Sequence, residues 1–304
     1  MKIRRLITSP PTGTPIERDP GDLATLLSII DPARFSPLDG RLHSSILRAR
    51  ARPYILRRLK EEVLEDLPDV IDSKETLELL APQWRSYRSA VRNQAAAADE
   101  QGILALVNEL RMICDFDPKS GASSKVEPIL EILENVAASS EKAVVFSYLL
   151  KPLYLLREKL ARALGDKALA TLEGSMSLAE RDLTLDRFRT DEKVCVLLAS
   201  SRVGGQGLTL TEANHVIFFN EWWNPSANAQ ARDRVVRIGQ KRGVRVYRFR
   251  CKDTIEEVLD EILAAKSHTI AEVIGRLAEP PRVLDEELLS VVRQLKLKIE
   301  HGAT

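Results

Sequence analysis

Apolar runs alternate with amphipathic segments along the second half of the chain. Four continuous apolar runs predict buried strands, at residues 143–147, 168–172, 194–198 and 215–219, and another strand is expected at 244–250. Helical periodicity is found between them at 152–163 and 177–189, and Ser177 with Glu180 predicts a capping box. Strands that alternate with helices indicate an α/β fold with a parallel sheet covered on both faces.

The first half of the chain shows mainly helical patterns. Residues 1–40 are rich in proline, and a short helix is expected there only at 23–30. A strand is predicted at 76–81, and helices are predicted at 82–98, 102–114, 126–138, 253–274 and 285–299. Within the helix at 82–98, Trp84, Tyr87 and Val91 share one face, so we expect them to be buried.

A glycine-rich loop follows the strand at 194–198. Its sequence is Gly204-Gly205-Gln206-Gly207, and three glycines in four positions let the backbone approach a phosphate closely. In an open parallel sheet, ligands bind beyond the carboxyl ends of the strands, which is where this loop lies. The loop is therefore a candidate phosphate-binding element.

A helix is expected after the strand at 215–219, and it would place two arginines on one side. Asn224-Pro225 predicts its start and Gly239 its left-handed end. Helical spacing predicts a buried stripe and an adjacent polar stripe, with Ala231, Val235 and Ile238 in the first and Gln230, Arg234 and Arg237 in the second. Two arginines held beside a packed face can be aimed at a triphosphate. The alternative is a solvated helix with an ordinary salt bridge through Asp233.

Composition restricts the classes of partner. With 304 residues, 44% hydrophobic and 29% charged, the chain is an ordinary soluble globular protein, and we expect it in the cytoplasm, or at the nucleoid in a bacterium, with no membrane partner. The net charge of +1 does not attract nucleic acid by itself, so local patches must bind any phosphate. The three cysteines and four histidines show no metal-ligand spacing, and we expect no metal bound by this chain alone.

The glycine loop and the arginine segment together resemble motifs V and VI of the Swi/Snf-type ATPases, a branch of helicase superfamily two. The resemblance rests on Gly204-Gly205-Gln206-Gly207, Trp223-Asn224-Pro225 and the run from Gln230 to Gln240, in which Val236 replaces a frequent histidine. Weaker likenesses to family segments are found at 12–17, 52–70, 110–114, 142–147, 172–175 and 253–257, and at Ser124-Lys125, where the family carries Ser-x-Lys.

This resemblance implies a RecA-like three-layer sandwich, the second helicase lobe, preceded by a mostly helical linker segment. Residues 1–75 would be the end of the first motor lobe with the inter-lobe linker, 76–275 the C-terminal helicase lobe, and 276–304 a helical tail. ATP with Mg²⁺ would be held in a cleft shared with a first lobe, which belongs to another part of the protein or acts in trans. Double-stranded DNA is the other implied partner.

The resemblance also assigns roles to residues. Arg234 and Arg237 would be arginine fingers, with Gln230 holding their geometry. The ATP cleft would include Gly205, Gly207 and Asp233. Contacts to the DNA backbone would come from Arg202, Gly204, Thr209, Thr211, Trp223 and Asn224.

The sequence contains neither Gly-x-x-x-x-Gly-Lys-Ser/Thr nor Asp-Glu-x-His, the motifs that hold the ATP phosphates and Mg²⁺ in the first lobe. We therefore expect the chain alone not to hydrolyse ATP. Two alternatives remain at this point. One is a non-catalytic DNA- or protein-binding module derived from such a motor. The other is an unrelated α/β phosphate-binding enzyme, which would need a nucleophile or metal-binding carboxylates at the strand ends.

Overall fold

The computed structural model describes residues 20–42, 44–54, 68–94, 100–200, 208–222 and 225–260. The chain forms two compact units, one made of Met1–Glu65 with Ile262–Val283 and the other of Asp66–Glu261 with Leu284–Thr304. The helix expected at 285–299 and most of the helix expected at 253–274 lie outside the described residues. The tail expected at 276–304 also lies outside them.

The described part of the first unit is helical. It consists of α1 (Pro20–Ile30), η1 (Pro37–Arg41), α2 (Ser44–Ala51) and η2 (Arg52–Tyr54). Its small core contains Leu23, Leu27, Phe35, Leu47 and Ala51, and Tyr54 packs against it. The rings of Phe35 and Tyr54 meet edge to face with centroids 5.0 Å apart. The helix expected at 23–30 is therefore present, and it begins at Pro20, a residue suited to a first helical turn.

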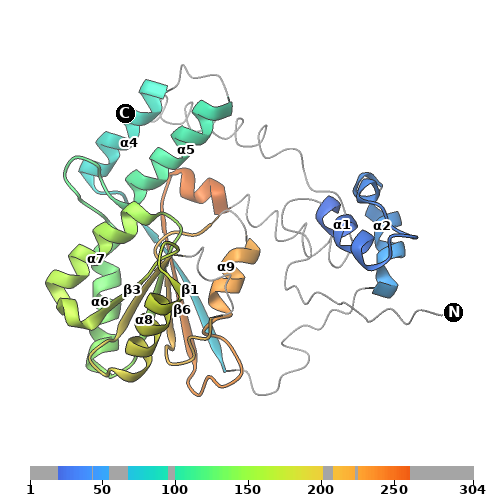
Figure 1. Ribbon diagram of the computed structural model, residues 1–304. Coiled ribbons are helices and arrows are strands. Elements are labelled where there is room, and N and C mark those ends of the chain that lie inside the picture. Colours follow the sequence, from blue (N-terminus) through green and yellow to red (C-terminus); the bar gives the residue numbers. More distant parts are fainter. Residues whose placement is uncertain are drawn as a thin grey trace. The chain divides into compact units, whose positions relative to one another are not determined.

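The second unit is built on a six-stranded parallel sheet (Figure 1). Its strands are β1 (Val70–Leu77), β2 (Ala143–Ser147), β3 (Leu169–Leu172), β4 (Val196–Ser200), β5 (His215–Phe218) and β6 (Val244–Cys251). The strand order is β1-β6-β5-β2-β4-β3, and every paired strand runs parallel to its neighbour. The predicted α/β fold with a parallel sheet is confirmed.

Helices cover both faces of this sheet. The helices of this unit are α4 (Ala81–Gln94), α5 (Glu100–Asp115), α6 (Val126–Ala138), α7 (Leu150–Leu164), α8 (Leu178–Thr190) and α9 (Pro225–Arg232), with η3 (Asp166–Ala168) and a helical segment at 255–260. Apolar side chains of α6 and α7 pack on one face of the sheet, and those of α8 and α9 pack on the other. Figure 1 shows α6 and α7 on one side of the sheet and α9 on the other. The expected three-layer sandwich is thus observed.

Strand β1 begins six residues before the predicted start at 76, so it crosses the expected domain boundary. Residues 70–76 are exposed, because β1 is the edge strand and pairs only with β6. Its sequence, VIDSKETL, contains five polar or charged residues in eight and has no continuous apolar run. Backbone hydrogen bonds to β6 hold β1 in the sheet, with Val70 opposite Val244 and Leu77 opposite Cys251. The hydrophobic pattern of the sequence therefore does not reveal the start of this strand.

Side chains fix both ends of α8. At its start, Ser177 accepts a hydrogen bond from the Glu180 backbone and the Glu180 carboxylate accepts one from the Ser177 backbone, which confirms the predicted capping box. Beyond its end, the Lys142 ammonium donates to the carbonyl oxygens of Phe188, Asp191 and Val194 at 2.6, 2.8 and 2.9 Å. A lysine favours a helix carboxyl end because the free carbonyls there carry partial negative charge. Lys142 thereby joins α8 to the amino end of β2.

The predicted arginine helix is shorter than expected. Helix α9 ends at Arg232, and Arg234 and Arg237 lie in the turns at 233–238, which we call the arginine turn. Ala231 and Val235 are buried, but Ile238 is 62% exposed and Val236 is buried instead. The prediction of one continuous helix, with a polar stripe of Gln230, Arg234 and Arg237, was therefore wrong.

Tertiary hydrogen bonds explain the early end of α9. The Leu210 N–H donates to the Arg234 carbonyl at 2.9 Å, and the buried Gln240 side chain donates to the Ala213 carbonyl at 2.6 Å. These bonds hold the chain against the segment at 208–213 and outweigh its local helical preference. Gly239 does adopt the left-handed conformation, with φ of 99°, but it closes the arginine turn and not the helix.

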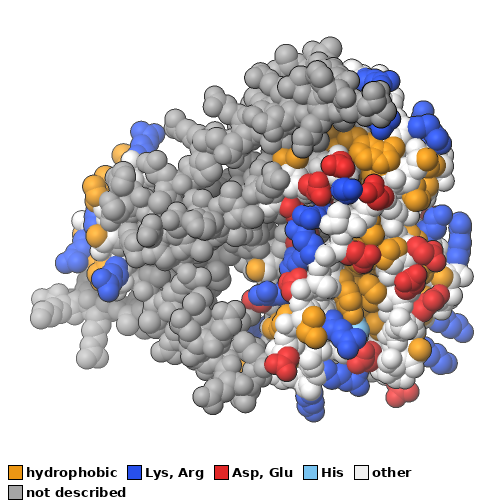
Figure 2. All heavy atoms as spheres, turned by 180° about the vertical axis from the view of Figure 1, so that it is seen from behind, with side chains coloured by type: hydrophobic (Ala, Val, Ile, Leu, Met, Phe, Trp, Pro, Cys, Tyr) orange, Lys and Arg blue, Asp and Glu red, His pale blue; other side chains and the backbone are white. Residues whose placement is uncertain are grey.

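The described surface carries mixed charge. On the face seen in Figure 2, basic and acidic side chains are interspersed, in keeping with the net charge of +1. Among the described residues, no helix is both long and apolar enough to cross a membrane.

Candidate functional site

The carboxyl edge of the sheet is where a parallel α/β domain binds its ligands. The segments that leave this edge after β4 and β5 carry most of the predicted site. Residues 201–207 and 223–224 lie outside the described part of the chain. The roles expected for Arg202, Gly204, Gly205, Gly207, Trp223 and Asn224 consequently remain predictions.

Side chains from three helical elements fix the backbone that follows β5, residues 219–222, which we call the rim turn. Lys125, which directly precedes α6, donates from Nζ to the Phe219 carbonyl at 3.2 Å. Arg111 of α5 donates from Nη2 to the Glu221 carbonyl. Asn228 of α9 accepts from the Trp222 N–H at 3.0 Å and donates to the Trp222 carbonyl at 2.8 Å. Three of the four rim-turn carbonyls thus have side-chain donors.

The remaining residue of the rim turn, Asn220, is held by its side chain. Its amide nitrogen donates to the Asp115 carboxylate at 2.7 Å and to the Ser147 hydroxyl at 3.0 Å. Its amide oxygen accepts from the Tyr148 N–H at 2.6 Å. Because Asn220 is buried, these bonds also satisfy polar groups that water does not reach. They join the rim turn to the end of β2.

A buried ionic cluster lies beneath the rim turn. The fully buried Lys125 ammonium is 2.9 Å from the Asp115 carboxylate and 2.5 Å from that of Glu256, which belongs to the 255–260 helix. Burial raises the pKa of Asp115 to about 6, and Glu256 adds to this rise while Lys125 opposes it. Burial would lower the pKa of Lys125, but Asp115 and Glu256 raise it well above its usual range. The lysine therefore remains a cation.

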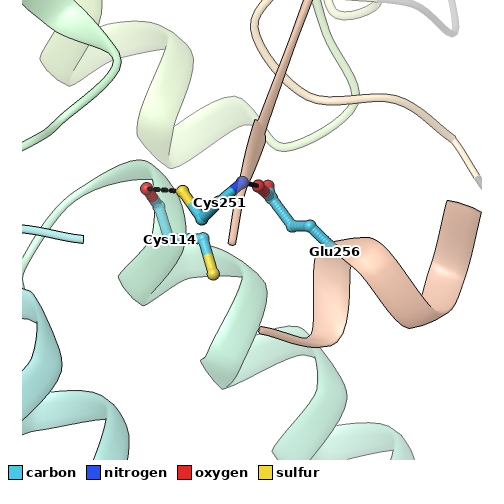
Figure 3. Close-up of side chains that lie close together, drawn as sticks. All are labelled: Cys114, Cys251 and Glu256. Atoms are coloured by element: carbon cyan, nitrogen blue, oxygen red, sulfur yellow. Dashed lines mark hydrogen bonds between the residues drawn. The ribbon is translucent and has the colours of Figure 1, made fainter. Parts of the chain in front are cut away.

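Two cysteines and Glu256 lie close together near this cluster (Figure 3). One ligand atom from each of Cys114, Cys251 and Glu256 lies within 4.8 Å of the other two. Glu256, however, already accepts hydrogen bonds from Lys125 and from the Cys251 N–H, and the Cys251 thiol donates to the Cys114 carbonyl at 3.6 Å. Burial also raises the pKa of the Cys114 thiol well above its usual range. Glu256 already binds the Lys125 cation and the Cys251 N–H, and burial disfavours the thiolate of Cys114, so the group does not fit a metal site.

The arginine turn brings three predicted site residues together. Arg237 donates from Nη1 to the Thr209 hydroxyl at 3.3 Å, so the segment after the glycine-rich loop meets the arginines. Burial lowers the pKa of Arg234, the neighbouring Arg237 lowers it further, and Asp233 opposes both. Arg234 is half-buried and Arg237 is exposed, and two neighbouring guanidinium groups of this kind are a donor set suited to a polyphosphate.

The remaining predicted site residues lie near this turn. Gln230 is half-buried in α9, two residues before its end, and Thr211 is half-buried in the segment after Thr209. Asp233 lies 3.4 Å from the guanidinium group of its neighbour Arg232, which is the kind of ordinary ion pair that we considered as the alternative. The structure thus groups Thr209, Arg234 and Arg237.

Comparison with known proteins decides the family. Residues 124–239 match the model of the helicase conserved C-terminal domain. The protein YwqA of Bacillus subtilis is 34% identical over 239 residues, which cover 72% of this chain and 26% of YwqA. The Sulfolobus solfataricus SWI2/SNF2 ATPase core in complex with dsDNA is 27% identical with a TM-score of 0.61, covering 95% of this chain and 65% of that one. The chain carries a SWI2/SNF2-type helicase C-terminal lobe.

The fold of this SWI2/SNF2-type lobe agrees with that of an isolated domain. The Sulfolobus solfataricus SWI2/SNF2 ATPase C-terminal domain aligns with a TM-score of 0.59 at 24% identity, covering 75% of this chain and 98% of that one. This chain aligns with 26% of YwqA, so it spans about a quarter of the length of that protein. An unrelated phosphate-binding enzyme is excluded by the family match.

Sequence reasoning missed the residues that anchor the rim turn of the SWI2/SNF2-type lobe. Lys125 was noted only as part of a family pattern, and Asn220 and Asn228 were not singled out. The sequence did hold a signal for two of the residues beneath this turn. Asp115 and Lys125 are charged residues at the ends of strongly amphipathic helices, where a buried ion pair can form. The pairing of Lys125 with Glu256, 131 residues later, is set by the fold and has no signature in the sequence.

Proposed function

We propose that this lobe is one half of an ATP-dependent DNA translocase, a motor of the chromatin-remodelling type. In this proposal Arg234 and Arg237 act as arginine fingers on ATP bound with Mg²⁺ against a first lobe. The observation that carries the proposal is the arginine turn, where Arg237 contacts Thr209 at 3.3 Å and lies close enough to Arg234 to lower the pKa of that guanidinium group.

The chemistry of phosphoryl transfer explains why two such arginines are useful. Charge is spread over the oxygens of the transferred group in the transition state, and preorganised cations stabilise it without reorganisation. The half-buried position of Arg234 strengthens this effect, because a charge acts over a longer range where water is partly excluded. Gln230 would hold the finger geometry, and Gly205, Gly207 and Asp233 would line the same cleft.

DNA would bind along the same edge of the sheet. Thr209 and Thr211, with Arg202, Gly204, Trp223 and Asn224, would contact the phosphate backbone and give sequence-independent, salt-sensitive binding. The SWI2/SNF2 ATPase core that resembles this chain was solved with dsDNA, which supports this partner. The hydrogen bond between Thr209 and Arg237 would then connect the DNA side of the site to the ATP side.

The test is ATP hydrolysis by the chain alone and mixed with a first-lobe polypeptide, each with and without duplex DNA. We expect hydrolysis only in the mixture, stimulated by DNA. Arg234→Ala and Arg237→Ala should each reduce kcat about a thousandfold, the typical effect of losing an arginine finger. Arg242→Ala is the matched control, since Arg242 has a side chain 54% exposed and lies near Glu141 at the amino edge of the sheet. It should keep at least half of the activity.

Other outcomes separate the alternatives. Hydrolysis by the chain alone would contradict the assignment of ATP binding to a first lobe. If no mixture hydrolyses ATP but DNA binding is present and weakens as salt increases, the chain is a non-catalytic binding module. An equal loss in Arg242→Ala would show that only the general positive charge matters, and the arginine fingers would be rejected.

A further inference from the structure

We propose that Lys125 is a positioning residue that couples the 255–260 helix to the arginine turn through the rim turn. The coupling itself is a statement about the described structure. Its effect on Arg234 and Arg237 during hydrolysis rests on the function proposed above.

Three separate parts of the fold meet at one ammonium group. Asp115 at the end of α5, Glu256 in the 255–260 helix and the Phe219 carbonyl of the rim turn all lie within 3.2 Å of Lys125 Nζ. The Phe219 ring also packs beneath this cation, with its centroid 5.6 Å from Nζ. Because Lys125 is 0% exposed, water does not compete for any of these contacts. A shift of the 255–260 helix must therefore change the bonding of the rim turn.

The rim turn passes this restraint to α9. Only two residues separate Phe219 from Trp222, whose N–H and carbonyl are both bonded to the Asn228 side chain. From Asn228, one turn of α9 leads to Arg232, whose carbonyl accepts from the N–H groups of Val235 and Val236 at 2.9 and 3.0 Å. Those two buried valines lie between Arg234 and Arg237 in the chain. The path from Lys125 to the arginines thus runs through short hydrogen bonds and one short helix.

Burying a lysine at such a site costs free energy, because its charge loses contact with water. An apolar side chain of similar length would avoid the desolvation of a cation and two carboxylates, and replacing buried ion pairs in that way is often neutral or stabilising. Lys125, however, binds a backbone carbonyl and two carboxylates from different elements at once, and an apolar side chain cannot do so. We therefore assign to Lys125 a role in fixing geometry, beyond a contribution to stability.

The chain offers a matched control in Lys142. Like Lys125, Lys142 donates to three oxygen acceptors, although all three of its acceptors are backbone carbonyls. It also lies over an aromatic ring, that of Phe188, with its Nζ 5.2 Å from the centroid. Its partners belong to α8 and to the residues between α8 and β4, and not to the rim turn. Loss of Lys142 should disturb the structure to a comparable degree in a different place.

The experiment compares three variants of the full chain. Lys125→Met removes the cation, and the triple variant Lys125→Met with Asp115→Asn and Glu256→Gln removes the unpaired carboxylates as well, so that folding is preserved. Lys142→Met is the control. Amide hydrogen exchange is followed at residues 219–222 and 226–236, together with steady-state ATP hydrolysis in the presence of a first-lobe polypeptide and DNA.

We expect the triple variant to speed exchange about tenfold at the rim turn and through α9, and to lower kcat about tenfold with little change in KM, as loss of one hydrogen bond to a charged group predicts. Lys142→Met should speed exchange in α8 and leave residues 219–236 and kcat unchanged. A folded triple variant with normal exchange in α9 would overturn the coupling. Faster exchange with normal kcat would overturn the positioning role. If the wild-type mixture does not hydrolyse ATP, only the proposed function is rejected, because the hydrogen-exchange comparison does not depend on hydrolysis.

Discussion

Asn228 holds the backbone of Trp222 by both of its polar groups. The Trp222 N–H donates to Asn228 Oδ1 at 3.0 Å, and Asn228 Nδ2 donates to the Trp222 carbonyl at 2.8 Å. A primary amide is the side-chain group that can both donate and accept in this way, and its two atoms are thereby assigned without ambiguity. The contact attaches α9 to the strand that precedes it, although residues 223–224 between them are not described.

Asn228→Asp tests this clamp with almost no change in shape. A carboxylate cannot donate to the Trp222 carbonyl, so two oxygens would face each other in a buried position. We expect the free energy of unfolding to fall by about 2 kcal/mol, measured by urea titration with circular dichroism. Asn93→Asp on the exposed side of α4 is the matched control and should change it by less than about 0.5 kcal/mol. Equal losses in both variants would contradict a specific clamp.

Lys142→Met tests the carboxyl end of α8. The variant leaves the carbonyls of Phe188, Asp191 and Val194 without their donor, and some of them are buried from water. Hydrogen bonds to a charged donor are strong, and we expect a loss of about 3 kcal/mol in the free energy of unfolding. The exposed Lys151→Met on α7 serves as control in the same urea titration. A change no larger than that of Lys151→Met would show that water replaces the ammonium group at no cost.

Asp115 predicts an unusual pH dependence. Burial raises its pKa from 3.8 to about 6, so the folded protein binds this proton more tightly than the unfolded chain does. Protonation of Asp115 should therefore increase the free energy of unfolding as the pH falls from about 6 to 4. Above that range Asp115 is ionised in both states, and this stabilising contribution is absent. The residues that face Asp115 are Lys125, Glu256 and Asn220. Lys125 remains a cation throughout, since its pKa lies far above this window.

The measurement for Asp115 is the difference in unfolding free energy between the wild type and Asp115→Asn from pH 7 to pH 4.5. Taking the difference removes the opposite effect of carboxylates such as Glu141, whose pKa is lowered despite burial by its bonds to His215 and Asn214. The difference should move in favour of the wild type as the pH falls. A flat difference would show that Asp115 titrates normally.

Thr209→Val tests the contact between the arginine turn and the segment after the glycine-rich loop. Valine keeps the shape of threonine but offers no oxygen to Arg237. If the two sides of the site are coupled, stimulation of ATP hydrolysis by DNA should fall about tenfold in the mixture with a first lobe, the value of one hydrogen bond to a charged group. Thr209→Ser restores the hydroxyl and should restore stimulation. Normal stimulation in the valine variant would separate the contact from function.

Buried elements were predictable from the sequence, because burial and hydrophobicity coincide there. Strand β2 and helix α6 have the predicted bounds, and β4 and β5 lie within two residues of theirs. Tyr87 and Val91 are buried as expected, while Trp84 is only half-buried. The glycine loop and arginine segment also sufficed to predict the family, since their spacing is long and specific.

Elements held by distant partners were not predictable in the same way. β1 is polar and is placed by its ladder to β6, and α9 ends early because Arg234 bonds to Leu210. The ionic cluster around Lys125 combines residues from three parts of the chain that no local pattern connects. Local propensity therefore describes the middle of the sheet well and its edges and turns poorly.

The strand order has a consequence for how the lobe is made. β6 lies between β1 and β5, and Val70 pairs with Val244 across 174 positions of the chain. During synthesis, β1 emerges first among these six strands and has no neighbour until β6 has left the ribosome, while β5, made later, keeps one edge open until the same moment. The polar sequence of β1 suits a strand that must wait unpaired, because charged and polar side chains discourage pairing with other exposed strand edges. The last strand thus closes the sheet, and a chain shortened before residue 244 would leave β1 with nothing to join.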